Sequence, residues 1–285
     1  MLQFLILRKG KNQTPVHCSH TSHIGRTERD IFEQIVGGVK PTKPVKTAVA
    51  ILHKDWPVCS GTLIGRYWLV TAAHCFTDVN LADMKVVAGG NNLSSYFLSK
   101  SSKVKTAGIK DVHIARSYRR IKFLNDLGNK AVAELDNDLA LVEMTEPLEE
   151  NENIAHAALP PPGMRITGME LEVSGWGVQG IYKTQPRSLL TINILVKQEA
   201  ECASTHGGTT LSPSRMFCGG SLDGTTCLGD SGGGALYFGY HTPALLGVVS
   251  FGEEYCDTSS VYTWVDTLLS WILSVTKIRY CIVMI

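Results

Sequence analysis

The sequence predicts an all-β fold, and three observations lead to that class. The chain has 27 glycines and 11 prolines in 285 residues, which indicates many turns. From residue 35 onward, short apolar runs alternate with turn residues at the spacing of strands in a barrel or sandwich. No segment has a convincing helical period before residues 266–275, where apolar side chains can line one face of a closing helix.

The expected strands follow the apolar runs in chain order. Hydrophobic residues make up 44% and charged residues 19% of the chain, a composition typical of a folded globular protein. The runs cover residues 48–52, 63–70, 85–88, 139–144, 171–173, 189–196 and 245–251.

The first 34 residues differ from the rest, since they are polar and mixed. Three histidines, His17, His20 and His23, are spaced by three there, which suggests a metal cluster. No carboxylate or cysteine framework completes such a site, so we favour a solvated pro-segment and expect no metal. The apolar stretch at residues 2–7 is too short for a secretory signal. Either the true start lies upstream, or the chain is not exported by that route.

Charge and hydropathy exclude two classes of partner. Lys and Arg number 27 against 26 Asp and Glu, so the net charge is +1 and no global basic field points to nucleic acid. No apolar run reaches the length of a membrane-spanning helix, so we expect no membrane insertion.

Eight cysteines indicate an oxidising, extracellular compartment. None forms a C-x-x-C pair, which disfavours zinc or thioredoxin-type chemistry. An even number spread through a glycine-rich β composition fits disulfides and secretion.

Three short motifs indicate the chemistry: Thr71-Ala72-Ala73-His74-Cys75, Asp136-Asn137-Asp138-Leu139-Ala140-Leu141 and Cys227-Leu228-Gly229-Asp230-Ser231-Gly232-Gly233. Each alone is weak, because a lone histidine, a turn aspartate or a serine between glycines is common. In the order His, Asp, Ser they are specific for one arrangement, a nucleophilic serine with its base and orienting carboxylate.

With these motifs, the sequence resembles the chymotrypsin-like serine proteases from Ile35-Val36-Gly37-Gly38 to the final helix near Val275. The resemblance implies two antiparallel six-stranded β-barrels with a C-terminal helix. It implies a protease domain over residues 35–275, with residues 1–34 as a pre/pro segment and 276–285 as a tail without assigned role. It further implies a secreted, monomeric endopeptidase that acts on proteins or peptides, meets protein inhibitors and needs no cofactor.

The resemblance also assigns roles within the motifs. Ser231 attacks the scissile carbonyl, His74 takes and returns the proton, and Asp138 orients and stabilises the imidazolium. The backbone N–H groups of Gly229 and Ser231 form the oxyanion hole.

Activation is expected by cleavage before Ile35, whose new amino group would pair with Asp230 beside the nucleophile. Gln34 stands where many relatives have Arg or Lys, so we expect an activating protease unlike trypsin.

The primary specificity pocket is assigned by the same resemblance to Thr225, Ser250, Gly252 and Ser260. The resemblance also places Ser250 behind Asp138, where its backbone would contact the substrate. Thr225 stands where trypsin-like enzymes have aspartate. It supplies no charge for a buried cation, so specificity is expected to be non-tryptic, for apolar or small residues.

The resemblance pairs six of the cysteines. The expected disulfides are Cys59–Cys75, Cys202–Cys218 and Cys227–Cys256. Cys18 and Cys281 are left over, and they can pair with each other, pair between chains or stay free.

Three further features depart from the family pattern. The pocket wall at residues 256–262 is about two residues short and lacks its usual Pro-Gly. Gly234 replaces a proline after the serine motif, so the strand leaving Ser231 is expected to be less rigid. About a dozen extra residues around 121–134 are expected to form a solvated loop, or else an exosite or gate beside the cleft.

These departures leave a second function open, a catalytically weak or silent relative that binds proteins as a decoy. Silent paralogues of this family are known in arthropods, including parasitic mites. The complete set of His74, Asp138 and Ser231 favours the active enzyme.

Overall fold

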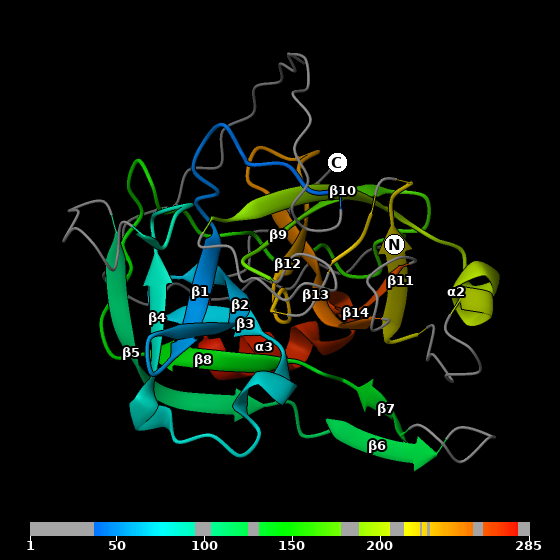
Figure 1. Cartoon of the computed structure of the whole chain (residues 1–285), viewed down its shortest axis with the longest axis horizontal. Helices are drawn as coiled ribbons and strands as arrows, with labels where there is room; N and C mark the ends of the chain where they lie inside the picture. Colours follow the sequence, from blue (N-terminus) through cyan, green and yellow to red (C-terminus); the bar gives the residue numbers. More distant parts are fainter. Residues whose placement is uncertain are drawn as a thin grey trace, which may run out of the picture.

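The computed structural model describes residues 37–94, 104–124, 131–177, 188–205, 214–222, 224–226, 229–252 and 259–278. In this part of the chain, strands dominate and close into two barrels, with a small separate hairpin (Figure 1). The prediction of two antiparallel six-stranded barrels with a C-terminal helix is confirmed.

The first barrel is formed by the N-terminal half of the chain. Its closed order is β1-β2-β3-β8-β5-β4, and every neighbouring pair is antiparallel. Alternating apolar residues turn inward, and Val49, Leu69 and Leu141 are fully buried. The strands are β1 (Ala48–His53), β2 (Trp56–Gly65), β3 (Trp68–Thr71), β4 (Met84–Ala88), β5 (Lys105–Ile114) and β8 (Ala140–Met144).

The second barrel repeats this architecture in the C-terminal half. Its closed order is β10-β11-β14-β13-β12-β9, again antiparallel throughout. Its core includes Phe217 and Tyr262, whose rings stack with centroids 5.0 Å apart. The strands are β9 (Glu170–Gly175), β10 (Leu190–Val196), β11 (Met216–Gly220), β12 (Gly234–Tyr237), β13 (Ala244–Gly252) and β14 (Ser260–Trp264).

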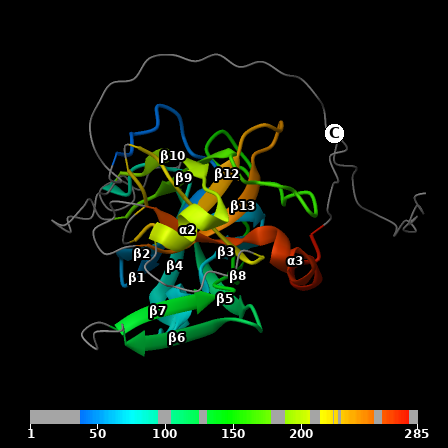
Figure 2. The same cartoon turned by 90° about the vertical axis from the view of Figure 1, so that its right-hand side faces the viewer.

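Helices are few and short in the described residues. α2 (Glu199–Thr205) precedes β11, and α3 (Leu269–Thr276) follows the 3-10 turn η4 (Val265–Leu268). α3 belongs to the second half of the chain (Figure 2). Its Leu269 and Ile272 nevertheless belong to the buried cluster of the first barrel. Two further 3-10 turns are η1 (Ala73–Phe76) and η2 (Leu81–Asp83). None of the described helices is long and apolar enough to cross a membrane.

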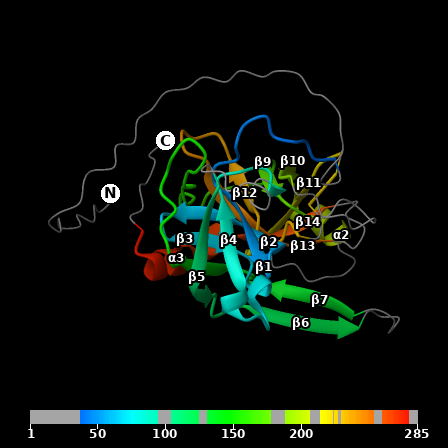
Figure 3. The ribbon, with the colours of Figure 1, turned by 60° about the vertical axis from the view of Figure 1, so that its left-hand side comes forward.

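Two local predictions are wrong. The apolar run at 63–70 is not one strand, because β2 ends at Gly65 and β3 begins at Trp68 after a tight turn. The inserted segment is not simply a loop, since β6 (Arg119–Leu124) and β7 (Ala131–Asp136) pair in register over six residues. This hairpin projects from the first barrel at the lower edge of the molecule (Figure 3).

The two barrels meet through hydrogen bonds and a shared core. Leu236, Leu245 and Val248 of the second barrel belong to the same buried cluster as the first-barrel residues. The backbone N–H of Ser60 on β2 donates to the carbonyl of Ser231, which precedes β12, at 2.8 Å. The serine motif is therefore attached directly to a strand of the opposite barrel.

Candidate active site

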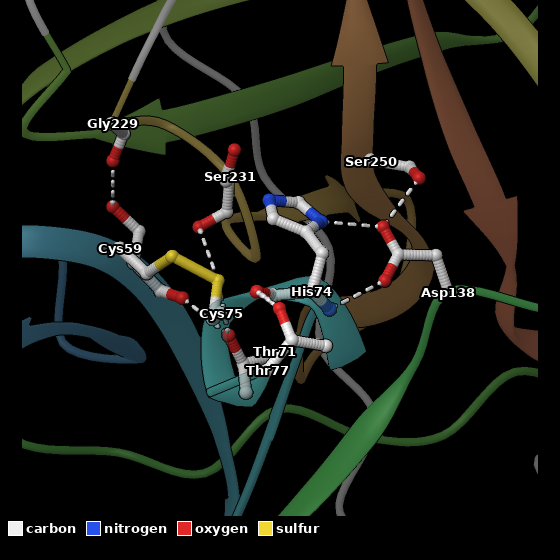
Figure 4. The surroundings of a disulfide bond; sticks show 10 residues. Cys59, Thr71, His74, Cys75, Thr77, Asp138, Gly229, Ser231 and Ser250 are labelled. Carbon is white, nitrogen blue, oxygen red and sulfur yellow. Dashed lines mark hydrogen bonds and ion pairs between the residues drawn. A yellow bond between two sulfur atoms is a disulfide. The ribbon is translucent and has the colours of Figure 1, made fainter. Parts of the chain in front are cut away.

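His74 lies in η1, immediately after β3 of the first barrel. A disulfide between Cys59 on β2 and Cys75 ties this turn to the barrel wall (Figure 4). The Thr77 hydroxyl donates to the His74 carbonyl at 2.9 Å and closes the turn. The side chain of His74 keeps 22% of its surface exposed, so the imidazole is held in place but remains accessible.

Asp138 is fully buried just before β8, and its carboxylate accepts three hydrogen bonds. The His74 backbone N–H donates to Oδ1 at 2.9 Å, and His74 Nδ1 lies 2.7 Å from Oδ2. The Ser250 hydroxyl on β13 also donates to Oδ2, at 2.6 Å. An ionised carboxylate only accepts, so Nδ1 bears the proton and Nε2 is left as the basic nitrogen.

Ser231 lies on the Nε2 edge of the His74 ring, opposite Asp138 (Figure 4). Within the described residues, no hydrogen bond joins the Ser231 hydroxyl to His74. Such bonds are often long without substrate and tighten when it binds. Gly232 makes the sharp turn after the serine, with φ at +82° and no room for a Cβ, which would lie 2.0 Å from the Thr71 hydroxyl. A glycine is therefore required where the serine motif meets the first barrel.

Two backbone N–H groups of the serine motif, those of Gly229 and Ser231, bear on its chemistry. Gly229 has φ at +94°, and its carbonyl accepts a hydrogen bond from the Ser60 hydroxyl at 3.3 Å. Among the residues that the structure describes, neither the N–H of Gly229 nor that of Ser231 has an acceptor. Both are available for an oxygen that gains negative charge.

Asp230 is fully buried beside Ser231. The N–H of Gly177 donates to its carboxylate at 2.8 Å, and a Cβ on Gly177 would lie 2.6 Å from the same carboxylate. The Asp230 carboxylate therefore fits only because residue 177 has no side chain. Its expected partner, Ile35, and the cysteines of the expected Cys227–Cys256 disulfide lie outside the described residues, as do Cys18 and Cys281.

The predicted pocket residues divide into two groups. Thr225 and Ser260 lie together, with their hydroxyl oxygens 2.9 Å apart, and the Thr226 hydroxyl donates to Ser260 at 2.6 Å. A Cβ on Gly252 would lie 3.1 Å from the Ser260 hydroxyl, so Gly252 borders the same cluster. The Ser250 side chain contacts Asp138, the neighbour that the resemblance gives it. Residues 253–258, which include the first three residues of the shortened wall, are outside the described residues.

The hydroxyl cluster at the expected pocket is polar and uncharged. Thr225, Thr226 and Ser260 are each at most 3% exposed. Burial raises the pKa of the nearby Tyr262 hydroxyl, so that group also stays neutral. Among the described residues, this cluster offers hydroxyl groups and no charged side chain.

One contact to Asp138 has no signal in the sequence. The Thr263 hydroxyl on β14 donates to the Asp138 carbonyl at 3.0 Å. Thr263 belongs to no motif, and 125 positions separate it from Asp138, so only the fold brings the two residues together.

Cysteine chemistry at the site is structural. The donor atoms of Cys59, Cys75 and His74 lie within 4.8 Å of one another, a spacing suited to a metal. A metal would need thiolates, and both sulfurs are bound in the disulfide. A second disulfide joins Cys202 on α2 to Cys218 on β11. These are the two expected pairs that the described residues include.

Comparisons with known proteins agree with this geometry. The family model described as Trypsin matches residues 35–272. Trypsin-3 of Salmo salar is 30% identical over 251 residues, covering 86% of this chain and 94% of the relative. Trypsin Tyr p 3.0101 of Tyrophagus putrescentiae is 30% identical over 248 residues, or 84% of this chain and 79% of that protein. Kallikrein 1-related peptidase b3 of Mus musculus is 30% identical over 251 residues, covering 85% of this chain and 89% of that protein. The chain therefore belongs to the trypsin family and is a serine-type endopeptidase.

Proposed function

We propose that this endopeptidase works through Ser231 as nucleophile, His74 as general base and acid, and Asp138 as the orienting carboxylate. The observation that supports it best is the buried Asp138 carboxylate, which accepts from His74 Nδ1 at 2.7 Å and leaves Nε2 facing Ser231 (Figure 4). A serine hydroxyl is a poor nucleophile at neutral pH and needs such a base beside it.

The reaction would proceed in two halves. As the Ser231 oxygen attacks the substrate carbonyl, its proton passes to His74 Nε2, and the carbonyl oxygen becomes an anion that accepts from the N–H groups of Gly229 and Ser231. The intermediate collapses, His74 returns the proton to the leaving amine, and an ester to Ser231 remains. Water then attacks that ester and loses its proton to His74, which passes it to the departing Ser231 oxygen as the acid product leaves.

We propose that the chain is made as a zymogen, with residues 1–34 removed by cleavage before Ile35. The buried Asp230 carboxylate, in a space lined by glycine, is a suitable partner for the new amino group. Gln34 argues against a trypsin-like activator. Incubation of the precursor with trypsin should give no new N-terminus at Ile35, and a clean Ile35 end would contradict this.

Primary specificity is proposed to be for apolar or small residues. The uncharged hydroxyl cluster of Thr225, Thr226 and Ser260 gives a cationic side chain no counter-ion. Cleavage-site mapping in a denatured protein mixture should give few cuts after Arg or Lys. A majority of such cuts would overturn the proposal.

Secretion and a monomeric state are proposed with this function, together with protein inhibitors as partners. The disulfides Cys59–Cys75 and Cys202–Cys218 require an oxidising compartment to form. The relatives quoted above carry the names of trypsins or of a peptidase. These names do not favour the alternative of a silent, protein-binding decoy.

Turnover by the cleaved chain tests the proposal. The full chain is made with residues 30–34 replaced by Asp-Asp-Asp-Asp-Lys, so that enteropeptidase cuts before Ile35. Peptide hydrolysis should appear on cutting and be absent in Ser231→Ala. A folded chain with a confirmed Ile35 end and no hydrolysis of a broad peptide mixture would favour the decoy.

A further inference from the structure

An ion pair to the buried Asp136 carboxylate joins the second barrel to the β6–β7 hairpin close to the candidate site. The side chain of Asp136 is only 8% exposed and accepts from two arginines. Arg215 Nε donates to Oδ1 at 2.8 Å and Arg215 Nη2 donates to Oδ2 at 3.1 Å, which makes a two-point contact. Arg119 adds one contact to Oδ2, at 3.2 Å.

The two arginines reach Asp136 from different parts of the fold. Arg119 begins β6 and lies opposite Asp136, the last residue of β7, in the same hairpin. Arg215 directly precedes β11 of the second barrel, 79 positions away in sequence. Of the two arginine contacts, only that of Arg215 therefore links the hairpin to the second barrel.

Asp136 is two residues before Asp138, and the link between them is tightly held. Asn137 adopts a left-handed conformation with φ at +52°, and its side-chain amide donates to the Ser117 carbonyl at 3.3 Å. A displacement of Asp136 would therefore be passed on to Asp138 through a short, constrained segment.

Residues of the second barrel hydrogen-bond to both ends of residues 136–138. The Arg215 carbonyl accepts from the N–H of Trp264, and the preceding residue, Thr263, donates its hydroxyl to the Asp138 carbonyl at 3.0 Å. Arg215 and Thr263 thus lie on adjoining strand ends and bind the two ends of residues 136–138. A planar guanidinium bound at two points also resists rotation, which a single contact does not.

We propose that Arg215 is a positioning residue for the Asp138–His74 pair, acting through Asp136. This rests on the proposed function of that pair. Arg215 does not touch the reacting atoms. It sets where the orienting carboxylate lies relative to the second barrel, which supplies Ser231. Small displacements of such groups lower the rate of the chemical step more than they weaken substrate binding.

Arg119 provides a matched control, because Arg119→Gln and Arg215→Gln each remove one positive charge from the same carboxylate. Long-range charge effects are then similar, and the difference in kcat between the variants reports the link from the hairpin to the second barrel. Both variants are made in the enteropeptidase-cleavable full chain and cut before Ile35. For each variant we would measure kcat and KM for a peptide substrate and the pH profile of kcat/KM. The rate of fluorophosphonate labelling and the Tm complete the comparison.

For Arg215→Gln we expect kcat and the labelling rate to fall by about tenfold, with KM within about twofold. The acid limb of its pH profile should move to lower pH, because a displaced Asp138 stabilises the imidazolium less. Arg119→Gln should keep kcat within about twofold of the wild type. Equal kcat values and equal pH profiles for the two variants at a temperature where both are folded would overturn the proposal.

Arg215→Lys covers the case in which Arg215→Gln does not fold. Lysine keeps the charge but makes a single-point contact, so we expect a kcat between those of the other two variants. A kcat equal to that of the wild type would overturn the positioning role. A wild-type chain that is neither labelled nor active after cutting would instead contradict the proposed function itself.

Discussion

Gly234 is the first residue of β12, and it lies where the two barrels press together. A Cβ built there would be 2.3 Å from the Thr62 hydroxyl of β2 and 2.6 Å from the Leu245 Cδ1 of β13. Thr62 is 2% exposed and Leu245 is fully buried, so neither neighbour has free space to move into. This close approach gives a physical reason for the glycine that replaces the family's proline three residues after Ser231.

We expect Gly234→Ala to destabilise the protein by overpacking. Forcing one methyl group into a well-packed core costs roughly 1–3 kcal/mol, and for a domain of this size about 2 kcal/mol lowers the Tm by roughly 4–8 °C. Thermal unfolding followed by circular dichroism measures this directly. Peptide hydrolysis at low temperature then shows whether the displaced strand also disturbs Ser231.

A double-mutant cycle with Thr62→Ala identifies the clashing group. Removing the Thr62 hydroxyl should restore part of the lost stability, so that the two substitutions together cost at least about 0.5 kcal/mol less than their sum. If Gly234→Ala unfolds within about 0.5 kcal/mol of the wild type, the close packing inferred between β12 and β2 is wrong.

Three further substitutions test other parts of the site and the fold. Ser250→Ala removes a hydrogen bond to the buried Asp138 carboxylate and should cost roughly 1.5–3 kcal/mol in urea unfolding, whereas an unchanged stability would show that this bond contributes nothing. Gly177→Ala places a Cβ 2.6 Å from the Asp230 carboxylate and should lower kcat of the cut chain by roughly a hundredfold, and full activity would refute the tight fit. Burial raises the pKa of Glu172, so the folded state binds more protons than the unfolded state just above the ordinary carboxyl range, and stability falls as pH rises through that window. Glu172→Gln should therefore raise the Tm at pH 7 and lose this advantage below pH about 4, and a gain independent of pH would contradict the assignment.

Much of the fold could be predicted because its longer strands are locally apolar. Residues 245–251 are a nearly continuous apolar run, and they form most of β13. By contrast, β11 and β14 are short and mixed in composition, and they pair as neighbouring strands of the closed barrel, from Met216 with Thr263 to Gly219 with Ser260. No local pattern encodes such long-range pairing. The helix α3 was placed well, although the chain first makes a 3-10 turn over Val265–Leu268.

The site divides in the same way. His74, Asp138 and Ser231 each lie in a short motif, so residue types and order were enough to select them. Arg215 and Thr263 have no motif, because their contacts to residues 136–138 arise only when the second barrel closes against the first. The hairpin β6–β7 was missed for a related reason, since an insertion relative to a family has no template and was expected to be a loop.

Mapping the adduct of a fluorophosphonate probe tests most directly whether Ser231 is the activated nucleophile. The cleavable full chain, cut before Ile35, is labelled, digested and analysed by mass spectrometry, with the uncut precursor and His74→Ala as controls. We expect one phosphonylated residue, Ser231, labelled only after the cut and only when His74 is present. Labelling that is unchanged in the precursor or in His74→Ala, or an adduct on a different serine, would contradict the proposed site.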